Sequence, residues 1–255
     1  MTTIPCTPSF RLDRKRALVT GAGRGIGLAA AAALAQAGAE VTMVARGADE
    51  IETAAAALRD SGHCAQAQIL DVADIAAVGR FFASHAAFDI LVNNAGTNRP
   101  MPMQDVTPDD YDAVMGLNVR SAFFVAQGAA RALLAEGKGG SLIHMGSQMG
   151  HVGGPNRSLY CASKWALEGM NKAFALDLAA QGIRSNTIAP TFIETPMTRP
   201  FFEDAGFRES VLAKIKLGRI GCVEDLMGAV VFLASDASAL MTGTSLVVDG
   251  GWTAD

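Results

Sequence analysis

The sequence is poor in charge, and it has no long apolar run. Only 18% of its 255 residues are charged, and the formal net charge is −4 without a basic tract. These values exclude a general electrostatic attraction to nucleic acid or to an anionic membrane surface. The longest apolar stretches, such as 29–35 and 229–234, are far shorter than the ~18 to 20 residues that span a bilayer.

Cysteine is scarce as well. The four cysteines, Cys6, Cys64, Cys161 and Cys222, are widely spaced and form no Cys-x-x-Cys pair. We therefore expect neither a metal site nor a disulfide framework. The first ten residues hold two prolines and no apolar core of signal-peptide length. We expect an irregular tail over 1–13 and a cytoplasmic protein.

Short apolar segments alternate with segments of helical character along the chain. We expect strands at 16–20, 41–45, 65–70, 90–93, 141–145, 183–189 and 245–248. We expect helices at 26–37, 48–61, 75–85, 108–136, 158–181 and 223–234. This alternation predicts an α/β fold, a Rossmann-type doubly wound parallel sheet with helices on both faces. We expect one domain over 1–255, in which 191–222 forms a substrate lid with helical turns.

A glycine-rich segment, TGAGRGIG at 20–27, connects the first predicted strand to the first predicted helix. Glycines at this place allow a tight turn and let the backbone approach a pyrophosphate. The helix N-terminus offers unpaired N–H groups to the same anion. The position of the segment therefore predicts a dinucleotide site.

Tyr160 and Lys164 stand four residues apart in a predicted helix, and Ser147 precedes Tyr160 by thirteen residues. Side chains four apart share one helix face, with ~5 to 6 Å between their Cβ atoms. The ammonium would stabilise the phenolate and lower the tyrosine pKa from its usual value of about 10. Tyr160 would then serve as an acid and base, and the Ser147 hydroxyl would hydrogen-bond the oxygen that changes charge.

Further motifs follow in a fixed order. They are Asp71-Val72, NNAG at 93–96, Asn118, Ser147, Tyr160-x-x-x-Lys164, PTFIET at 190–195 and VDGG at 248–251. Together with TGAGRGIG they resemble the short-chain dehydrogenase/reductase family, in its branch of about 250 residues. The resemblance covers nearly the whole chain, from Arg16 to Trp252.

This resemblance implies an NAD(P)-dependent oxidoreductase that acts on CH–OH groups. Such an enzyme interconverts a secondary alcohol, for example a polyol, sugar or hydroxy acid, and its ketone by hydride transfer. The implied tetrad is Asn118, Ser147, Tyr160 and Lys164. In it Tyr160 exchanges the proton, Ser147 positions the substrate, Lys164 binds the nicotinamide ribose, and Asn118 holds a water in a proton relay. The implied cofactor contacts are Gly21, Arg24, Gly25, Ile26, Gly27, Arg46, Asp71, Val72, Asn93, Ala95, Gly96, Tyr160, Lys164, Pro190, Ile193 and Thr195.

The charges near the second strand favour NADP(H) over NAD(H). A site for NAD places an acid about 20 residues beyond the glycines, where it binds the ribose 2′-OH. Ala45 occupies that position here, and Arg46 follows it, while Arg24 lies in the glycine loop. Two cations would meet a 2′-phosphate there. The nearby Asp49 and Glu50 are explained as first-turn acids of the next helix.

The sequence defines the substrate pocket less clearly than the cofactor site. Its walls should come from 97–99, 148–157 and 191–207, which mix Arg99, His151 and Arg157 with methionines and phenylalanines. Each arginine could bind a carboxylate or lie on a solvated rim. His151 is expected as a pocket wall or satisfied polar group. Ser147 and Tyr160 are the expected substrate contacts.

The motifs also bear on other functions and on the assembly. A 3-oxoacyl-type reductase of the same family stays open, and so does an inactive nucleotide-binding regulator, although the tetrad is intact. The three-residue gap between Tyr160 and Lys164 and the short C-terminus count against an enoyl reductase and against a sugar epimerase. The resemblance also implies a homotetramer, paired through 108–136, 158–181 and the C-terminal strand with Gly250-Gly251.

Overall fold

Seven parallel strands form one sheet in the order β3-β2-β1-β4-β5-β6-β7 in the computed structural model, which describes residues 3–254. The strands are β1 (Arg16–Thr20), β2 (Glu40–Ala45), β3 (Ala65–Ile69), β4 (Ile90–Asn93), β5 (Gly140–Met145), β6 (Ile183–Pro190) and β7 (Ser245–Val248). Each predicted strand overlaps an observed one. The central strands β1, β4 and β5 are almost wholly buried, because helices cover both faces of the sheet.

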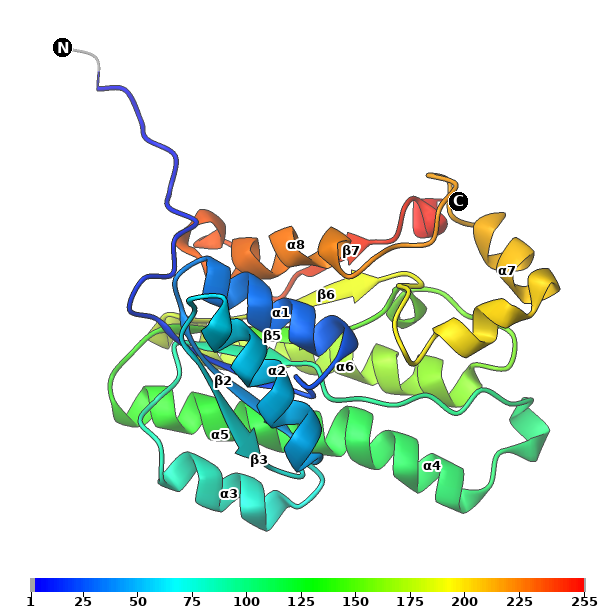
Figure 1. Cartoon of the computed structure of the whole chain (residues 1–255), viewed down its shortest axis with the longest axis horizontal. Helices are drawn as coiled ribbons and strands as arrows, with labels where there is room; N and C mark the ends of the chain where they lie inside the picture. Colours follow the sequence, from blue (N-terminus) through cyan, green and yellow to red (C-terminus); the bar gives the residue numbers. More distant parts are fainter. Residues whose placement is uncertain (1–2, 255) are drawn as a thin grey trace.

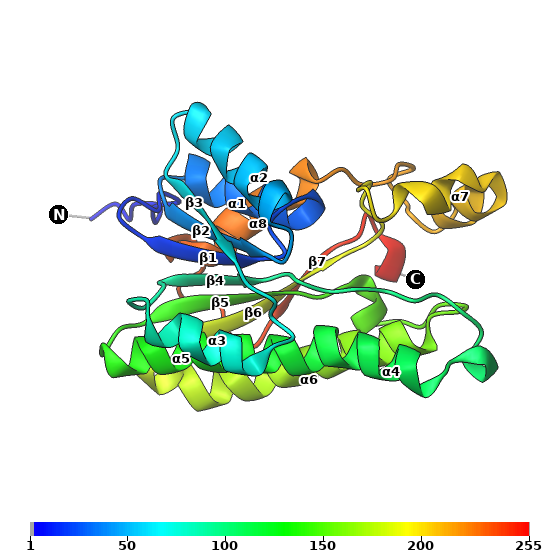
Figure 2. The ribbon, with the colours of Figure 1, turned by 60° about the horizontal axis from the view of Figure 1, so that its bottom comes forward.

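The helices form two layers (Figures 1 and 2). The layer on one face contains α1 (Gly25–Gln36), α2 (Ala48–Asp60) and α8 (Glu224–Ala234). The other contains α3 (Ile75–Ala83), α4 (Pro108–Met115), α5 (Ala122–Ala135) and α6 (Ser158–Leu178). Figure 2 shows these layers above and below the sheet, with α7 (Ala205–Leu212) beyond it beside the C-terminus. The predicted doubly wound fold is confirmed.

Each face of the sheet has its own core. Under α1 and α8 the core includes Leu34, Met43 and Val230, and alanines of α1 let that helix lie close to the strands. Under α3 and α5 it includes Phe88 and Leu133, with other aromatic rings around Phe88. Both cores fix the strand ends at which the site is built.

Two predicted elements differ from the structure. The helix expected over 108–136 is interrupted by a π-helical stretch, Gly116–Ser121. The tail expected over 1–13 is exposed and irregular only over 3–11, because Leu12 is 1% exposed and its N–H donates to the Ala37 carbonyl. Residues 1 and 2 lie outside the described part.

In the segment 191–222 the expected helical turns are η5 (Arg199–Glu203) and α7. No helix within residues 3–254 is both long and apolar enough to cross a membrane.

Candidate active site

A cavity of about 440 Å³ opens at the carboxyl ends of β1, β2, β4, β5 and β6. The strand order reverses between β1 and β4, and ligands of open α/β sheets bind at such a reversal. The cavity therefore occupies the place that the fold reserves for a dinucleotide.

The glycine loop between β1 and α1 forms one end of this cavity. Gly21 and Gly25 have φ values of +63° and +56°, which favour glycine. A Cβ on Gly27 would lie 2.1 Å from the Gly21 carbonyl oxygen, so no side chain fits there. No side chain among residues 3–254 caps the α1 N-terminus. Its N–H groups are thus suited to an anion.

The end of β2 carries the charges that favour NADP(H). Arg46 is exposed at the cavity and forms no ion pair within residues 3–254. Arg24 lies 3.2 Å from Glu50, which also lines the cavity. Glu50 stands in the first turn of α2, as expected, but it also offsets the charge of Arg24. Arg46 is therefore the stronger candidate for a 2′-phosphate contact.

The loops after β3 and β4 supply the middle of the cavity. Of the predicted cofactor contacts, Asp71, Val72, Ala95 and Gly96 line it, but Asn93 does not. The Asn93 amide is buried and donates to the Ala122 carbonyl at 2.7 Å, so it fastens α5 to the sheet.

Asn94 lines the cavity in its place. The Asn94 side-chain amide donates to the carbonyls of Thr20 and Gly21 at 2.9 and 3.2 Å, which ties this loop to the glycine loop. Successive residues of an extended chain point to opposite sides, so the one-residue offset decides which asparagine faces the cavity.

Three predicted catalytic residues line the same cavity: Ser147 after β5, and Tyr160 and Lys164 on α6. Lys164 is 8% exposed, and its ammonium donates to the Met145 carbonyl at 2.7 Å. The same ammonium lies 5.5 Å from the centre of the Tyr160 ring. Ser147 accepts from the Met149 N–H at 3.1 Å and donates to the Gln148 amide oxygen at 2.8 Å.

The pKa of Tyr160 differs from the expectation that Lys164 lowers it. Burial raises the pKa of this phenol to about 12, and the hydrogen bond with Ser147 and the charge of Arg157 offset only part of that rise. The ammonium of Lys164 is bound to the Met145 carbonyl and is itself desolvated. Burial lowers the pKa of Lys164 to about 8, against an opposing effect of Glu168.

Asn118, the fourth predicted residue, lies beneath the cavity in the π-helical stretch and does not line it. Its amide accepts from the Thr97 N–H at 2.8 Å and donates to the Thr97 carbonyl at 2.9 Å and to Ser163 at 3.0 Å. Single π-helical turns occur frequently at functional sites. Here the widened turn lets Asn118 join the loop after β4 to helix α6.

The cavity residues fit a dinucleotide. The glycine loop leaves room for a pyrophosphate, and the hydroxyl of Thr191 is a buried polar group without a partner among the described residues. Pro190, Ile193 and Thr195, which are predicted cofactor contacts, also line the cavity. Backbone bonds between Phe192, Glu194 and Gly221 close the base of the segment 191–222.

Comparisons with known proteins agree with this geometry. The family model described as Enoyl-(Acyl carrier protein) reductase matches residues 21–253. The chain is 37% identical to the gluconate 5-dehydrogenase of Gluconobacter oxydans over 96% of each chain. It belongs to the short-chain dehydrogenase/reductase family.

Other members share its fold and length. The L-xylulose reductase of Bos taurus is 36% identical over 96% of this chain and 99% of its own. A solved gluconate 5-dehydrogenase from Burkholderia cenocepacia, in complex with NADP and tartrate, is 41% identical with a TM-score of 0.91 and covers 96% of this chain and 98% of its own. This short-chain dehydrogenase/reductase is an NAD(P)-dependent oxidoreductase that interconverts a secondary alcohol and its ketone.

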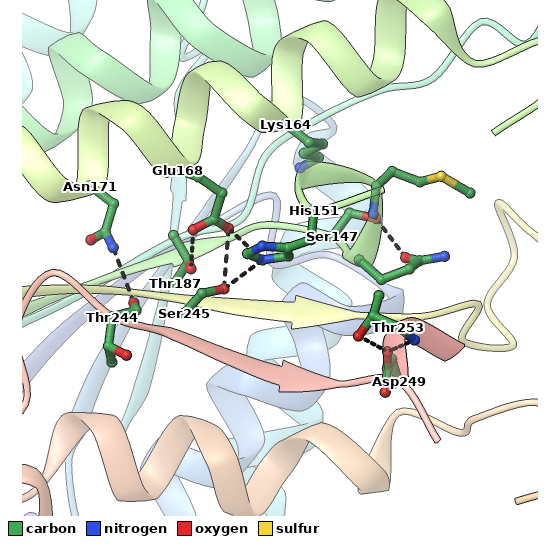
Figure 3. Close-up of polar contacts among 12 residues, drawn as sticks. Ser147, His151, Lys164, Glu168, Asn171, Thr187, Thr244, Ser245, Asp249 and Thr253 are labelled. Carbon is green, nitrogen blue, oxygen red and sulfur yellow. Dashed lines mark hydrogen bonds and ion pairs between the residues drawn. The ribbon is translucent and has the colours of Figure 1, made fainter. Parts of the chain in front are cut away.

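A buried carboxylate lies behind Lys164 of this dehydrogenase/reductase (Figure 3). Glu168 is 7% exposed, one helical turn after Lys164. It accepts hydrogen bonds from Thr187 at 2.9 Å and Ser245 at 3.3 Å, and His151 lies 3.6 Å away. Sequence reasoning missed Glu168, although its spacing of four from Lys164 places both side chains on one helix face.

Two predicted pocket residues lie elsewhere. His151 does not line the cavity and is bonded to Ser245 at 2.9 Å behind it, so it is a satisfied polar group. Arg99 does not line the cavity either, because its guanidinium turns to Asp110 at 2.7 Å. Within residues 3–254 no cluster of histidine, cysteine or acidic side chains could hold a metal ion.

Proposed function

We propose that this dehydrogenase/reductase acts on polyhydroxylated small molecules with NADP(H), and that Tyr160 is its acid and base. The observation that carries the proposal is the convergence of Ser147, Tyr160 and Lys164 on one cavity that begins at the glycine loop. The related gluconate and xylulose enzymes support the polyhydroxylated class.

Each residue of the tetrad has a role that its surroundings support. The bound cofactor supplies or accepts the hydride at its nicotinamide ring. Tyr160 passes a proton to the ketone oxygen in reduction and removes it from the alcohol in oxidation. Ser147 hydrogen-bonds the same oxygen, and Lys164 binds the nicotinamide ribose. Asn118 holds a water that connects Lys164 to solvent. The contacts of Asn118 with Thr97 and Ser163 fix the position of its side chain.

The cofactor contacts are proposed for the residues that line the cavity. They are Gly21, Arg24, Gly25, Ile26, Gly27, Arg46, Asp71, Val72, Asn94, Ala95, Gly96, Pro190, Ile193 and Thr195. Arg46 carries the NADP(H) preference, because Ala45 places no carboxylate at the end of β2 and Arg24 is engaged by Glu50. A guanidinium binds a phosphate through charge-assisted, bidentate hydrogen bonds.

Kinetics with both cofactors test the preference. We expect Arg46→Ala to lower kcat/KM for NADPH about 10- to 100-fold and to change kcat/KM for NADH by less than about threefold. Arg80→Ala is the matched control, because Arg80 is 72% exposed on α3 and lies outside the cavity. An unmutated enzyme that works better with NADH would overturn the charge argument.

A substrate screen tests the reaction class. Polyols, sugars, hydroxy acids and a 3-oxoacyl thioester are assayed at the nicotinamide absorbance, and Tyr160→Phe is assayed beside the unmutated chain. The thioester is included because the description of the matching family model names an acyl carrier. The thioester as the best substrate would favour the 3-oxoacyl-type reductase. Equal turnover by Tyr160→Phe would contradict the assigned role of Tyr160.

We propose a homotetramer in the cytoplasm. Trp165 and Leu176 of α6 are 54% and 83% exposed, and Phe123 of α5 is 37% exposed. These apolar side chains support pairing of α5 and α6 between copies. Cys6, Cys64 and Cys222 are exposed free thiols, which supports a reducing compartment.

A further inference from the structure

Arg157 is a buried charge beside the catalytic tyrosine. It precedes α6, lines the cavity and is 8% exposed. No carboxylate within residues 3–254 forms an ion pair with it, and the one hydrogen bond that its guanidinium makes to these residues goes to the neighbouring Asn156 carbonyl at 3.2 Å. A guanidinium has five N–H donors. Most of the donor capacity of Arg157 is therefore unused by the described residues.

A buried charge without a counter-ion is costly. The Phe201 ring, 5.9 Å from the guanidinium carbon, covers Arg157 from the side of the lid. Desolvation lowers the pKa of Arg157, and Tyr160 and Cys161 oppose this shift only when they are ionised. The site is thus arranged for an anion that arrives from outside the chain.

Arg99 provides the contrast. It belongs to a loop next to the cavity, but it is exposed and paired with Asp110. Its charge is already balanced, and it does not line the cavity. Of these two arginines, only Arg157 is both buried at the cavity and unpaired.

A second polar group beside the cavity has an unmet requirement. The side-chain oxygen of Asn98 is buried, and it accepts no hydrogen bond from the described residues. An amide oxygen accepts from a hydroxyl and repels a carboxylate. Asn98 therefore complements a hydroxyl group, whereas Arg157 complements a carboxylate.

We propose that Arg157 anchors the carboxylate of a hydroxy-acid substrate in this cavity while Asn98 accepts a hydrogen bond from one of its hydroxyls. This inference rests on the proposed function and narrows its substrate class. The carboxylate is bound and chemically unchanged. In oxidation the C–H bond at the hydroxyl-bearing carbon breaks, its electron pair leaves as hydride to NADP⁺, and the O–H proton passes to Tyr160.

Tartrate and threitol share a four-carbon diol but differ in charge, so their affinities report the effect of the carboxylates at nearly constant shape. Tartrate carries carboxylates where threitol carries neutral CH₂OH groups. Each is titrated by calorimetry into the full-length protein saturated with NADP⁺. Binding is measured rather than turnover, because the charge of Arg157 also acts on the pKa of Tyr160. We expect tartrate to bind at least about tenfold more tightly than threitol.

Three variants locate the anchor. Arg157→Met should abolish the preference for tartrate and change threitol affinity by less than about twofold. Arg157→Lys should keep part of the preference, because a point charge replaces a bidentate fork. Arg99→Met removes the same charge from the paired, exposed site and should keep the full preference. Thermal melts with NADP⁺ verify that each variant is folded.

The outcomes are distinct. An unmutated protein that binds threitol as tightly as tartrate, or an Arg157→Met variant that keeps the preference, overturns the anchor. Loss of the preference in Arg99→Met with retention in Arg157→Met also overturns it. The unmutated protein must first bind NADP⁺ before tartrate or threitol is titrated into it. Failure to bind NADP⁺ at that step would instead refute the proposed function.

Discussion

Tyr160 and Lys164 are both desolvated, but burial moves their pKa values in opposite directions. The phenol has a pKa of about 12 and the ammonium one of about 8, because burial disfavours the charged form of each. At neutral pH the protein therefore holds a protonated tyrosine next to a mostly charged lysine. This state is ready to protonate a ketone oxygen, whereas oxidation requires the phenolate.

This order of pKa values predicts opposite pH profiles for the two directions. We expect kcat/KM for ketone reduction to be flat below about pH 7 and to fall above about pH 8, as Lys164 loses its proton. We expect kcat/KM for alcohol oxidation to rise from pH 7 to about pH 8, because the phenolate fraction grows, and to level off above pH 8 as Lys164 loses its proton. Initial rates between pH 5.5 and 10 check both profiles. A reduction rate that climbs through pH 8 would contradict the assignment.

Glu168 should set the pH at which kcat/KM for ketone reduction falls. Its carboxylate raises the pKa of Lys164, so Glu168→Gln should lower that pKa and move the fall in reduction to lower pH. The loss should be roughly threefold at pH 8 and small at pH 6. His151 and Lys172 also face Glu168, so the comparison is made at constant ionic strength.

Asp177→Asn is the matched control for Glu168→Gln. Asp177 is exposed on the same helix, and its substitution changes the net charge equally. The control should leave the profile in place. If both variants shift the fall in reduction alike, Glu168 acts only through the overall field, and its local effect on the pKa of Lys164 is contradicted.

At the scale of elements, periodicity predicts the strands and most helices of this protein. Buried strands are short and apolar, so β1 and β4 are bounded correctly from sequence alone. The π-helical stretch Gly116–Ser121 is not visible in the pattern. It depends on tertiary contacts, namely those of Asn118 with Thr97 and Ser163.

The site shows the same division between local and tertiary information. The glycine loop and the Tyr160–Lys164 pair are local patterns, and the structure brings them together. Arg99, His151 and Arg157 lie in loops, where the sequence does not determine which side chains find partners. Arg99 is hydrogen-bonded to Asp110 and His151 to Ser245, whereas Arg157 lines the cavity.

The β5–β6 pair contains a buried histidine that should make the fold sensitive to acid. His144 is fully buried, bonds to Ser185 at 3.2 Å, and has its pKa lowered by burial to about 4. Between pH 6.5 and about 4 the unfolded chain binds a proton that the folded chain does not. Stability is complete above pH 6.5 and falls as the pH drops, by about 3 kcal/mol in total.

Denaturant unfolding at pH 7 and pH 4.5 measures this contribution. His144→Gln should lose stability at pH 7 but show a flatter dependence on pH, because no proton uptake is linked to its unfolding. His63→Gln removes a partly exposed histidine after α2 and should keep the unmutated slope. An unchanged slope in His144→Gln would show that other groups govern the acid response.

At the scale of the whole molecule, apolar side chains gather on the outer side of the α5–α6 layer. Trp165 and Leu176 share a face of α6 with Gly169, where an added Cβ would meet nothing within 4 Å. Phe123 and Leu134 are exposed on α5 at 37% and 44%. Such a face can pack closely against a copy of itself, as an isologous interface requires. The edge strand β7, paired only with β6, offers a second contact.

Trp165→Glu should break this assembly, because a charge would be buried in each copy of an apolar interface. Light scattering should give four times the 26.5 kDa chain mass for the unmutated protein and a smaller multiple for the variant. Ile69→Glu is the control, since Ile69 is 67% exposed on β3 at the opposite sheet edge and its substitution should leave the mass unchanged. If Trp165→Glu stays tetrameric while Ile69→Glu dissociates, the copies pair through the β3 edge instead of through α6. A single-chain mass for the unmutated protein would refute the tetramer itself.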